Sequence, residues 1–247
     1  MLSKITTSLK SPYQFTKFSL LILLFFVYSS VNATDINKGI KAYKAKDYKT
    51  ALQAFEALAN QGVAEAQYKL GNMYHEGSGV SLDYKKAFKL YMLAAEQSYS
   101  EAQFELGVMY YEGQGVPQNY KRMIKWYTLA AKQGVSEAQF DLGIMYNRGK
   151  GVAQDSNRAV KWITMAADQG HRLAQLKLTV MYGKGEQGIP QDYIRAHMWA
   201  NIMDASHIRL NSRNIPSSRD LLALKMTPEQ IEQAQEKASD WFDKHNN

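Results

Sequence analysis

The sequence predicts an all-α fold in which two-helix repeats stack into a solenoid that a C-terminal helix closes. The prediction rests on a phrase, Leu-Gly-x-Met-Tyr, that returns with a period of 36 residues and lies each time in an amphipathic helical pattern. The four copies begin at Leu70, Leu106, Leu142 and Leu178, and Thr179 replaces the glycine of the last copy. Because one such unit cannot bury its own apolar face, tandem copies must stack.

Residues 1–33 predict a secretory signal peptide. Three lysines and no acidic residue accompany an apolar run over residues 18–31, and Val31-Asn32-Ala33 offers small residues for cleavage after Ala33. Cleavage would send the mature chain to the periplasm or outside the cell and lower its net charge from +7 to +4. An uncleaved membrane anchor is the alternative, although the run is shorter than the roughly 20 residues that span a bilayer.

Three further segments follow the signal peptide. We expect an N-terminal capping helical hairpin over residues 34–62, four repeats over residues 63–206 and a C-terminal capping segment over residues 207–247. In this last segment Thr227-Pro228-Glu229-Gln230 has the composition of a capping box with proline at the first helical position. The chain contains no cysteine, which excludes disulfides and thiol catalysis.

Each repeat contains two predicted helices with different apolar patterns. The first carries residues such as Ala102, Leu106 and Tyr110 on one face and ends at a Gly-x-Gly pair, which favours helix termination over a phosphate-binding loop. A glycine within this helix, such as Gly107, indicates a close contact with the partner helix. The second helix repeats a tryptophan, as at Trp126, that we expect in the packed core, with an aromatic ligand platform as the alternative.

These motifs resemble the Sel-1-like repeat (SLR) family, which is related to the tetratricopeptide repeat. The resemblance covers residues 60–206 and rests on A-x-x-x-L-G-x-M-Y-x-x-G-x-G-V followed by D-Y-x-x-A-x-x-W-Y-x-x-A-A-x-Q-G. It implies a right-handed superhelix that acts as an adaptor for protein complexes and, in bacteria, is often exported. Some bacterial members have a disulfide in each repeat and have been credited with penicillin-binding or β-lactamase activity, which a chain without cysteine does not inherit.

The sequence predicts no catalytic, metal-binding or cofactor-binding residues. The histidines lack zinc-ligand spacing, and no serine after residue 33 precedes a lysine by three positions. Carboxylates such as Glu76, Glu101 and Glu112 are more typical of a solvated helix face than of a glycan-cleaving pair. A cell-envelope enzyme or peptidoglycan-binding module is the alternative to an adaptor.

Basic residues recur at one position of the second helix and predict a basic ridge. The ridge residues are Lys86, Arg122, Arg158 and Arg195. Such a ridge would suit peripheral contact with an anionic envelope surface, whereas nucleic acid is not expected as a partner. The alternative is a solvated face paired with Glu65, Glu101 and Glu137.

Positions that change between copies are free of stacking constraints and therefore available for a ligand. On the first helix three such positions share a face, and the first of them is Lys69, Glu105, Asp141 and Lys177 in successive copies. If first helices line the concave side, as in tetratricopeptide-like arrays, this face binds a protein or peptide. The predicted partner-binding residues are Asn72, His75, Val108, Tyr111, Ile144, Asn147 and Val180. Burial of these residues by the superhelical curl is the alternative.

Overall fold

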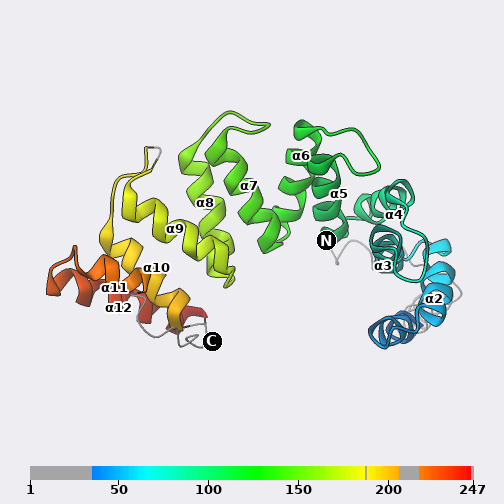
Figure 1. Cartoon of the computed structure of the whole chain (residues 1–247), viewed down its shortest axis with the longest axis horizontal. Helices are drawn as coiled ribbons and strands as arrows, with labels where there is room; N and C mark the ends of the chain where they lie inside the picture. The colour runs from blue at the N-terminus through cyan, green and yellow to red at the C-terminus, as the bar shows by residue number, and fades with distance from the viewer. Residues whose placement is uncertain (1–34, 187, 206–216, 246–247) are drawn as a thin grey trace, which may run out of the picture. The chain divides into compact units, whose positions relative to one another are not determined.

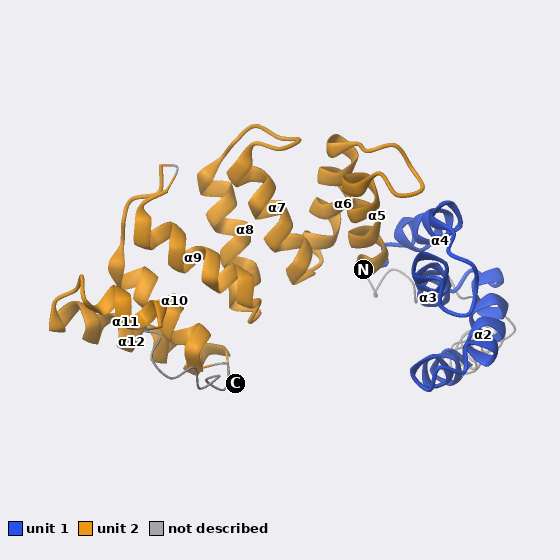
Figure 2. Cartoon of the chain, in the orientation of Figure 1, with its two compact units in different colours: residues 1–99 blue, residues 100–247 orange. Residues whose placement is uncertain are grey.

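The computed structural model describes residues 35–186, 188–205 and 217–245, in which all regular secondary structure is α-helical (Figure 1). Two units, residues 1–99 and 100–247, are described separately (Figure 2). Unit 1 contains a helix over residues 35–44, α2 (Tyr48–Asn60), α3 (Ala64–Glu76) and α4 (Tyr84–Glu96). Unit 2 contains α5 (Ser100–Glu112), α6 (Tyr120–Lys132), α7 (Ser136–Arg148), α8 (Ser156–Asp168), α9 (Arg172–Lys184), α10 (Tyr193–Ala205), α11 (Ser218–Ala223) and α12 (Pro228–His245). The consecutive hairpins α3–α4, α5–α6, α7–α8 and α9–α10 confirm the predicted all-α repeat fold.

Polar caps and glycines delimit the helices of each repeat. Every second helix begins after a side chain that accepts a hydrogen bond from the backbone N–H three residues later, at N···O distances of 2.9–3.0 Å. These caps are Asp83, Asn119, Asp155 and Asp192. Every first helix is followed by a glycine in the left-handed region, as at Gly149 with φ 67°. The Gly-x-Gly pairs therefore terminate helices, as predicted.

A glycine within each of the first three first helices brings the two helices of a repeat close together. A Cβ on Gly107 would lie 2.3 Å from Cδ1 of Tyr127, and one on Gly143 would lie 2.5 Å from Cγ1 of Ile163. In unit 1, Gly71 faces Tyr91 in the same way. The close contact predicted at these glycines is confirmed.

The residue after the tryptophan, rather than the tryptophan itself, forms the core of the inner second helices. Trp126 and Trp162 are half-buried, whereas Tyr127 and Ile163 are 3% and 0% exposed. The expected burial of the tryptophan column is therefore wrong for these two repeats and holds only for Trp199. The physical reason is the glycine, whose missing side chain leaves space opposite Tyr127 and Ile163.

The fourth repeat reverses the sizes of the two partners. Thr179 takes the place of the glycine, and Ala200 takes the place of the tyrosine or isoleucine. Both residues are buried, and the Thr179 hydroxyl donates a hydrogen bond to the carbonyl oxygen of Gln175 at 2.9 Å. A larger residue on the first helix is thus matched by a smaller one on the second.

Within unit 2, buried glutamines of α7 and α9 link these helices to the preceding repeat, a feature that sequence reasoning missed. The Gln139 amide donates to the carbonyl oxygen of Ala131 in the preceding repeat at 3.0 Å and accepts from Gln169 in its own repeat at 2.7 Å. Gln175 donates to the Ala167 carbonyl at 3.1 Å, but its buried Oε1 has no hydrogen-bond partner among the described residues. This series of glutamine hydrogen bonds, the glutamine ladder, therefore ends at the fourth repeat.

The N-terminal hairpin is a shortened version of the repeat. A Cβ on Gly39 would lie 2.6 Å from Cε1 of Phe55, which reproduces the glycine–aromatic contact of the full repeats. The Asp47 side chain caps α2 by accepting from the Thr50 N–H at 3.2 Å. This segment of unit 1 thus keeps the packing rule of the array with a shorter connection.

The C-terminal helix α12 buries residues at the spacing found in the first helices of the repeats. Ala234 and Ala238 align with Ala66 and Leu70 of α3 and are likewise buried. The expected capping box is present, since Thr227 and Gln230 exchange hydrogen bonds at 3.0 and 3.3 Å. Because α12 packs on α10, Ile202 is fully buried, whereas its counterparts are partly exposed. Those counterparts are Leu129 and Met165, each 37% exposed.

The predicted signal peptide and the connection over residues 206–216 lie outside the described residues. Within the described part of the chain, no helix combines the length and apolar character needed to cross a membrane.

Candidate functional site

Three predicted partner-binding residues meet in one pocket of unit 2. Val108 and Tyr111 on α5 and Ile144 on α7 line a cavity of about 340 Å³, which we call the α5–α7 pocket. All three side chains are half-buried, so they are anchored in the fold and still reach the cavity. The pocket is therefore built by the first helices of two successive repeats.

The other predicted residues lie elsewhere. Asn72 and His75 belong to unit 1, where Asn72 accepts a hydrogen bond from the Tyr91 hydroxyl at 2.8 Å and the His75 ring meets the Tyr84 ring edge-on. Val180 is half-buried on α9. Asn147 is only 4% exposed, which corrects the expectation that it faces a ligand groove, because its position on α7 turns it into the protein.

Asn72 also lines a smaller cavity of about 130 Å³ in unit 1. Its neighbours there include Lys69 and Glu76 on α3 and Phe55 on α2. Lys69 occupies the register position that carries Asp141 in the α5–α7 pocket. The two cavities therefore differ in charge at an equivalent place.

Six residues of the α5–α7 pocket were not predicted. They are Glu112, Tyr127, Phe140, Asp141, Met145 and Arg148. Asp141 belongs to the variable set recognised in the sequence, although it was not among the predicted partner-binding residues. Met145 occupies a position that is methionine in all four copies, so no variation marked it, and Tyr127 lies on the second helix, away from the variable face of the first helices.

Burial governs the electrostatics of this pocket. Removal from water raises the pKa of Asp141 to about 6, the Tyr127 hydrogen bond opposes this shift, and the charge of Glu137 adds to it. Burial also raises the pKa of the Tyr127 hydroxyl, and Asp141, Glu105 and Glu112 contribute through their negative charges. The pocket thus concentrates negative potential around a partly buried carboxylate.

The basic ridge is engaged within the protein. The Arg122 guanidinium donates to the Tyr110 hydroxyl at 2.9 Å and lies 5.5 Å from its ring centroid. The other ridge cations face the equivalent tyrosine of their own repeat at 3.9 to 5.6 Å. Arg158 and Arg195 also pair with the capping aspartates three residues earlier, at 3.2 Å each.

This arrangement explains the recurrence of the ridge by packing. A cation over a tyrosine ring fastens the start of the second helix to the end of the first. The aspartates and tyrosines are partners that the sequence interpretation, which considered Glu65, Glu101 and Glu137, did not include.

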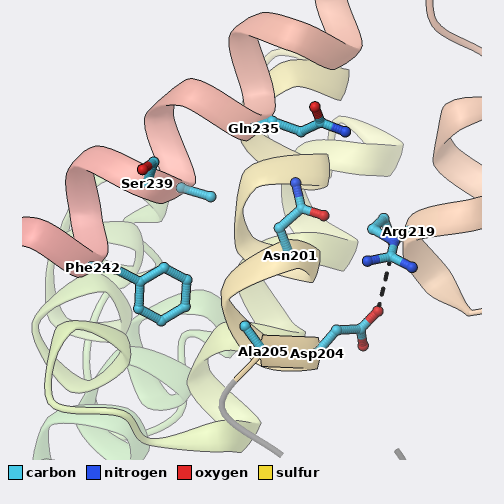
Figure 3. A pocket seen from close by; sticks show the side chains of 8 residues that line it. Asn201, Asp204, Ala205, Arg219, Gln235, Ser239 and Phe242 are labelled. Atoms are coloured by element: carbon cyan, nitrogen blue, oxygen red, sulfur yellow. Dashed lines mark ion pairs between the residues drawn. The ribbon is translucent and has the colours of Figure 1, made fainter.

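A larger cavity of about 650 Å³ lies between α10 and α12 (Figure 3). Asn201 on α10 lies toward Gln235 and Ser239 on α12, whereas Asp204 on α10 pairs with Arg219 at 3.9 Å. The charged residues that line it therefore already face each other. Across the described residues, no group of histidine, aspartate and glutamate side chains has the arrangement of a metal site.

Comparison with known proteins agrees with this architecture. A sequence model of the Sel1 repeat matches residues 64–99, 100–135, 136–171 and 172–202. The structure is similar to that of a Sel1 repeat protein from Oxalobacter formigenes, with 30% identity, a TM-score of 0.61 and coverage of 83% of this chain and 99% of that one. No curated protein matches the sequence.

A second similar structure is c5321, a protective antigen present in uropathogenic Escherichia coli strains that displays an SLR fold. It is 26% identical, with a TM-score of 0.51 and coverage of 87% of this chain and 54% of that one. Since the repeat matches span more than half of the sequence and the hairpins follow them, the chain belongs to the Sel1 repeat family.

Proposed function

We propose that this protein is an exported adaptor that binds a protein or peptide partner through the α5–α7 pocket and the adjoining face of its first helices. One observation carries the proposal: residues that vary between repeats, Val108, Tyr111 and Ile144, converge on a single cavity. Sel1 repeats generally mediate protein–protein interactions, and scaffolds of this family are typically not catalytic.

The composition of the pocket suits a peptide side chain. Apolar and aromatic walls supply desolvated contact area, and a few polar groups at defined positions supply orientation. The volume lies at the small end of the roughly 300–1,000 Å³ range of ligand sites, which favours one anchoring side chain over a large cofactor.

Export is the second part of the proposal and rests on the sequence of residues 1–33. N-terminal sequencing of the protein recovered from outside the cytoplasm should read Thr-Asp-Ile-Asn. A chain that still begins at Met1 in the membrane fraction would refute cleavage.

Selection from a displayed library of random peptides tests the binding function. Because a few anchors carry most of the free energy of peptide recognition, Tyr111→Ala and Ile144→Asp should each weaken the selected peptides by about 1–3 kcal/mol, or about 5-fold to 150-fold. A double control variant of the second helices, Lys125→Ala with Lys161→Ala, should bind as the wild type does. All variants are first compared by circular dichroism and melting temperature. Selected peptides that tolerate the pocket variants and lose binding to the control would place the site elsewhere.

A further inference from the structure

The α5–α7 pocket and its repeat-equivalent cavity in unit 1 differ in the sign of their charge. Asp141 and Glu112 line it together with Arg148, so negative charge exceeds positive charge within the lining. The rest of the chain has the opposite balance, since the net charge is +4 after cleavage behind Ala33. The charge of the pocket lining is therefore opposite in sign to the net charge of the chain.

We propose that the α5–α7 pocket holds the cationic side chain of an arginine or lysine of the partner, with its charge against Asp141 and its alkyl chain along Tyr111 and Ile144. This inference rests on the proposed function and names the residue that the peptide must supply. It follows from charge complementarity within a cavity of about 340 Å³ that has aromatic walls.

The aromatic residues of the pocket match a cation as well as an apolar stem. Tyr111, Tyr127 and Phe140 all line the cavity. Aromatic faces attract arginine and lysine, and the same molecule already uses this chemistry. The ammonium group of Lys150 lies 4.5 Å from the Tyr111 ring centroid and 4.5 Å from that of Tyr120.

The variation between repeats favours a ligand over a packing role for Asp141. At this register position the first and fourth repeats have Lys69 and Lys177, and Lys177 pairs with Glu186 at 3.1 Å. The second and third repeats have Glu105 and Asp141 instead. A position that accepts both charges is not fixed by stacking, so its negative sign in the pocket is available for recognition.

Two groups near Asp141 act on its ionisation, because the Tyr127 hydrogen bond lowers its pKa and the charge of Glu137 raises it. Glu105 and Glu112 come from α5 and Tyr127 from α6, while Glu137 and Arg148 lie on α7 with Asp141. His171, which precedes α9, feels the charge of Glu137 and stacks on Phe140 at 4.8 Å. Burial and neighbouring negative charge disfavour the carboxylate, and a bound guanidinium or ammonium group would restore it.

Capped pentapeptides with a single variable central residue test the proposal. Four glycines would flank arginine, citrulline or norleucine, because citrulline keeps the shape of arginine without its charge and norleucine offers an alkyl chain alone. Methyl NMR signals of Val108 and Ile144 report binding at the pocket itself. We expect saturable shifts with the arginine peptide and at least about tenfold weaker binding of the citrulline peptide.

Two aspartate-to-asparagine variants distinguish the effect of the charge in the pocket from the effect of the net charge of the protein. Asp141→Asn should remove the preference for arginine over citrulline, whereas Asp240→Asn, an exposed change on α12, should preserve it. Wild-type binding of the arginine peptide should weaken from pH 7.5 to pH 5, as Asp141 takes up a proton, and this dependence should be lost in Asp141→Asn.

The outcomes distinguish this inference from the proposed function. Equal binding of the arginine and citrulline peptides, stronger binding of the norleucine peptide, or no shift with any of them would overturn the cation site. Library-selected peptides that depend on Ile144 would then still support peptide binding. Loss of that dependence would overturn the proposed function itself.

Discussion

Asp141 illustrates how one residue can oppose the stability of the fold that positions it. Its pKa of about 6 lies above the value near 3.9 of an unfolded aspartate. The folded state therefore holds the proton more tightly between about pH 4 and pH 6, and the carboxylate lowers stability increasingly as the pH rises through this window. A group kept at such a cost is more typical of a binding site than of a packing position.

This cost predicts the behaviour of Asp141→Asn. The neutral amide escapes the desolvation penalty, so its free energy of unfolding should exceed that of the wild type by about 1–2 kcal/mol at pH 7.5. The gap should close toward pH 4, where the wild-type side chain is protonated. Urea unfolding followed by circular dichroism at several pH values measures the gap. Asp240→Asn, the same change at an exposed position of α12, serves as the comparison for removing a charge alone.

The ridge cations offer a second prediction for single residues. Arg122→Met keeps the alkyl chain but removes the guanidinium from the Tyr110 ring, so we expect a loss of about 0.5–1 kcal/mol in stability. The exposed Lys132→Met, at the end of the same helix, should be nearly neutral. Thermal unfolding of both variants provides the measurement. Equal effects would mean that the ridge does not fasten the repeat through tyrosine.

At the level of helices, the sequence predicted where helices begin and end, which depends on nearby residues. It did not predict which side chains are buried between helices, which depends on packing partners distant in the sequence. The capping box that starts at Thr227 and terminators such as Gly149 depend on backbone chemistry within a few residues, and they lie where expected. The tryptophans were misplaced because only the packed hairpin shows that Gly107 admits Tyr127. The glutamine ladder was missed because a polar residue on an apolar face looks exposed until its partners in two repeats are known.

The glycine contact predicts opposite results for the same substitution in two helices. Gly107→Ala should lower stability by about 1–3 kcal/mol, because its Cβ would overlap the Tyr127 ring despite the better helix propensity of alanine. In Gly183→Ala the nearest side-chain atom would be 3.5 Å away, so this variant should gain up to about 1 kcal/mol. Chemical denaturation distinguishes them. Stabilisation of both variants would show that the Gly107 contact is not tight.

For the whole molecule, repetition made the fold predictable and the binding site less so. The period of 36 residues indicated the architecture because every copy repeats the same packing. The same logic singled out Val108, Tyr111 and Ile144 by their variation, but it had no means of showing that Asn147 turns inward or that Met145 reaches the pocket. Those facts depend on how two repeats rotate against each other.

Removal of α12 predicts a graded response along unit 2. Deletion of residues 227–247 would expose Trp199 and Ile202. Because each repeat is stabilised by its neighbours, α9 and α10 should lose stability first. Hydrogen exchange should therefore accelerate there while α5 and α6 remain protected. A milder variant, Trp241→Phe, removes the hydrogen bond to Asp168 and should give a smaller effect of the same kind. Uniform acceleration across unit 2 would contradict local stacking.

The reversed sizes of Thr179 and Ala200 also bear on how an array of similar hairpins avoids misassembly. During folding, a first helix could associate with the second helix of another repeat, since their apolar patterns are nearly interchangeable. Thr179 opposite Ile163 would put two large side chains in one space, and Ala200 opposite Gly143 would leave a void. Both wrong pairings cost more than the correct ones. The exchange of one small and one large residue thus distinguishes the last hairpin and disfavours pairing of its helices with those of the third repeat.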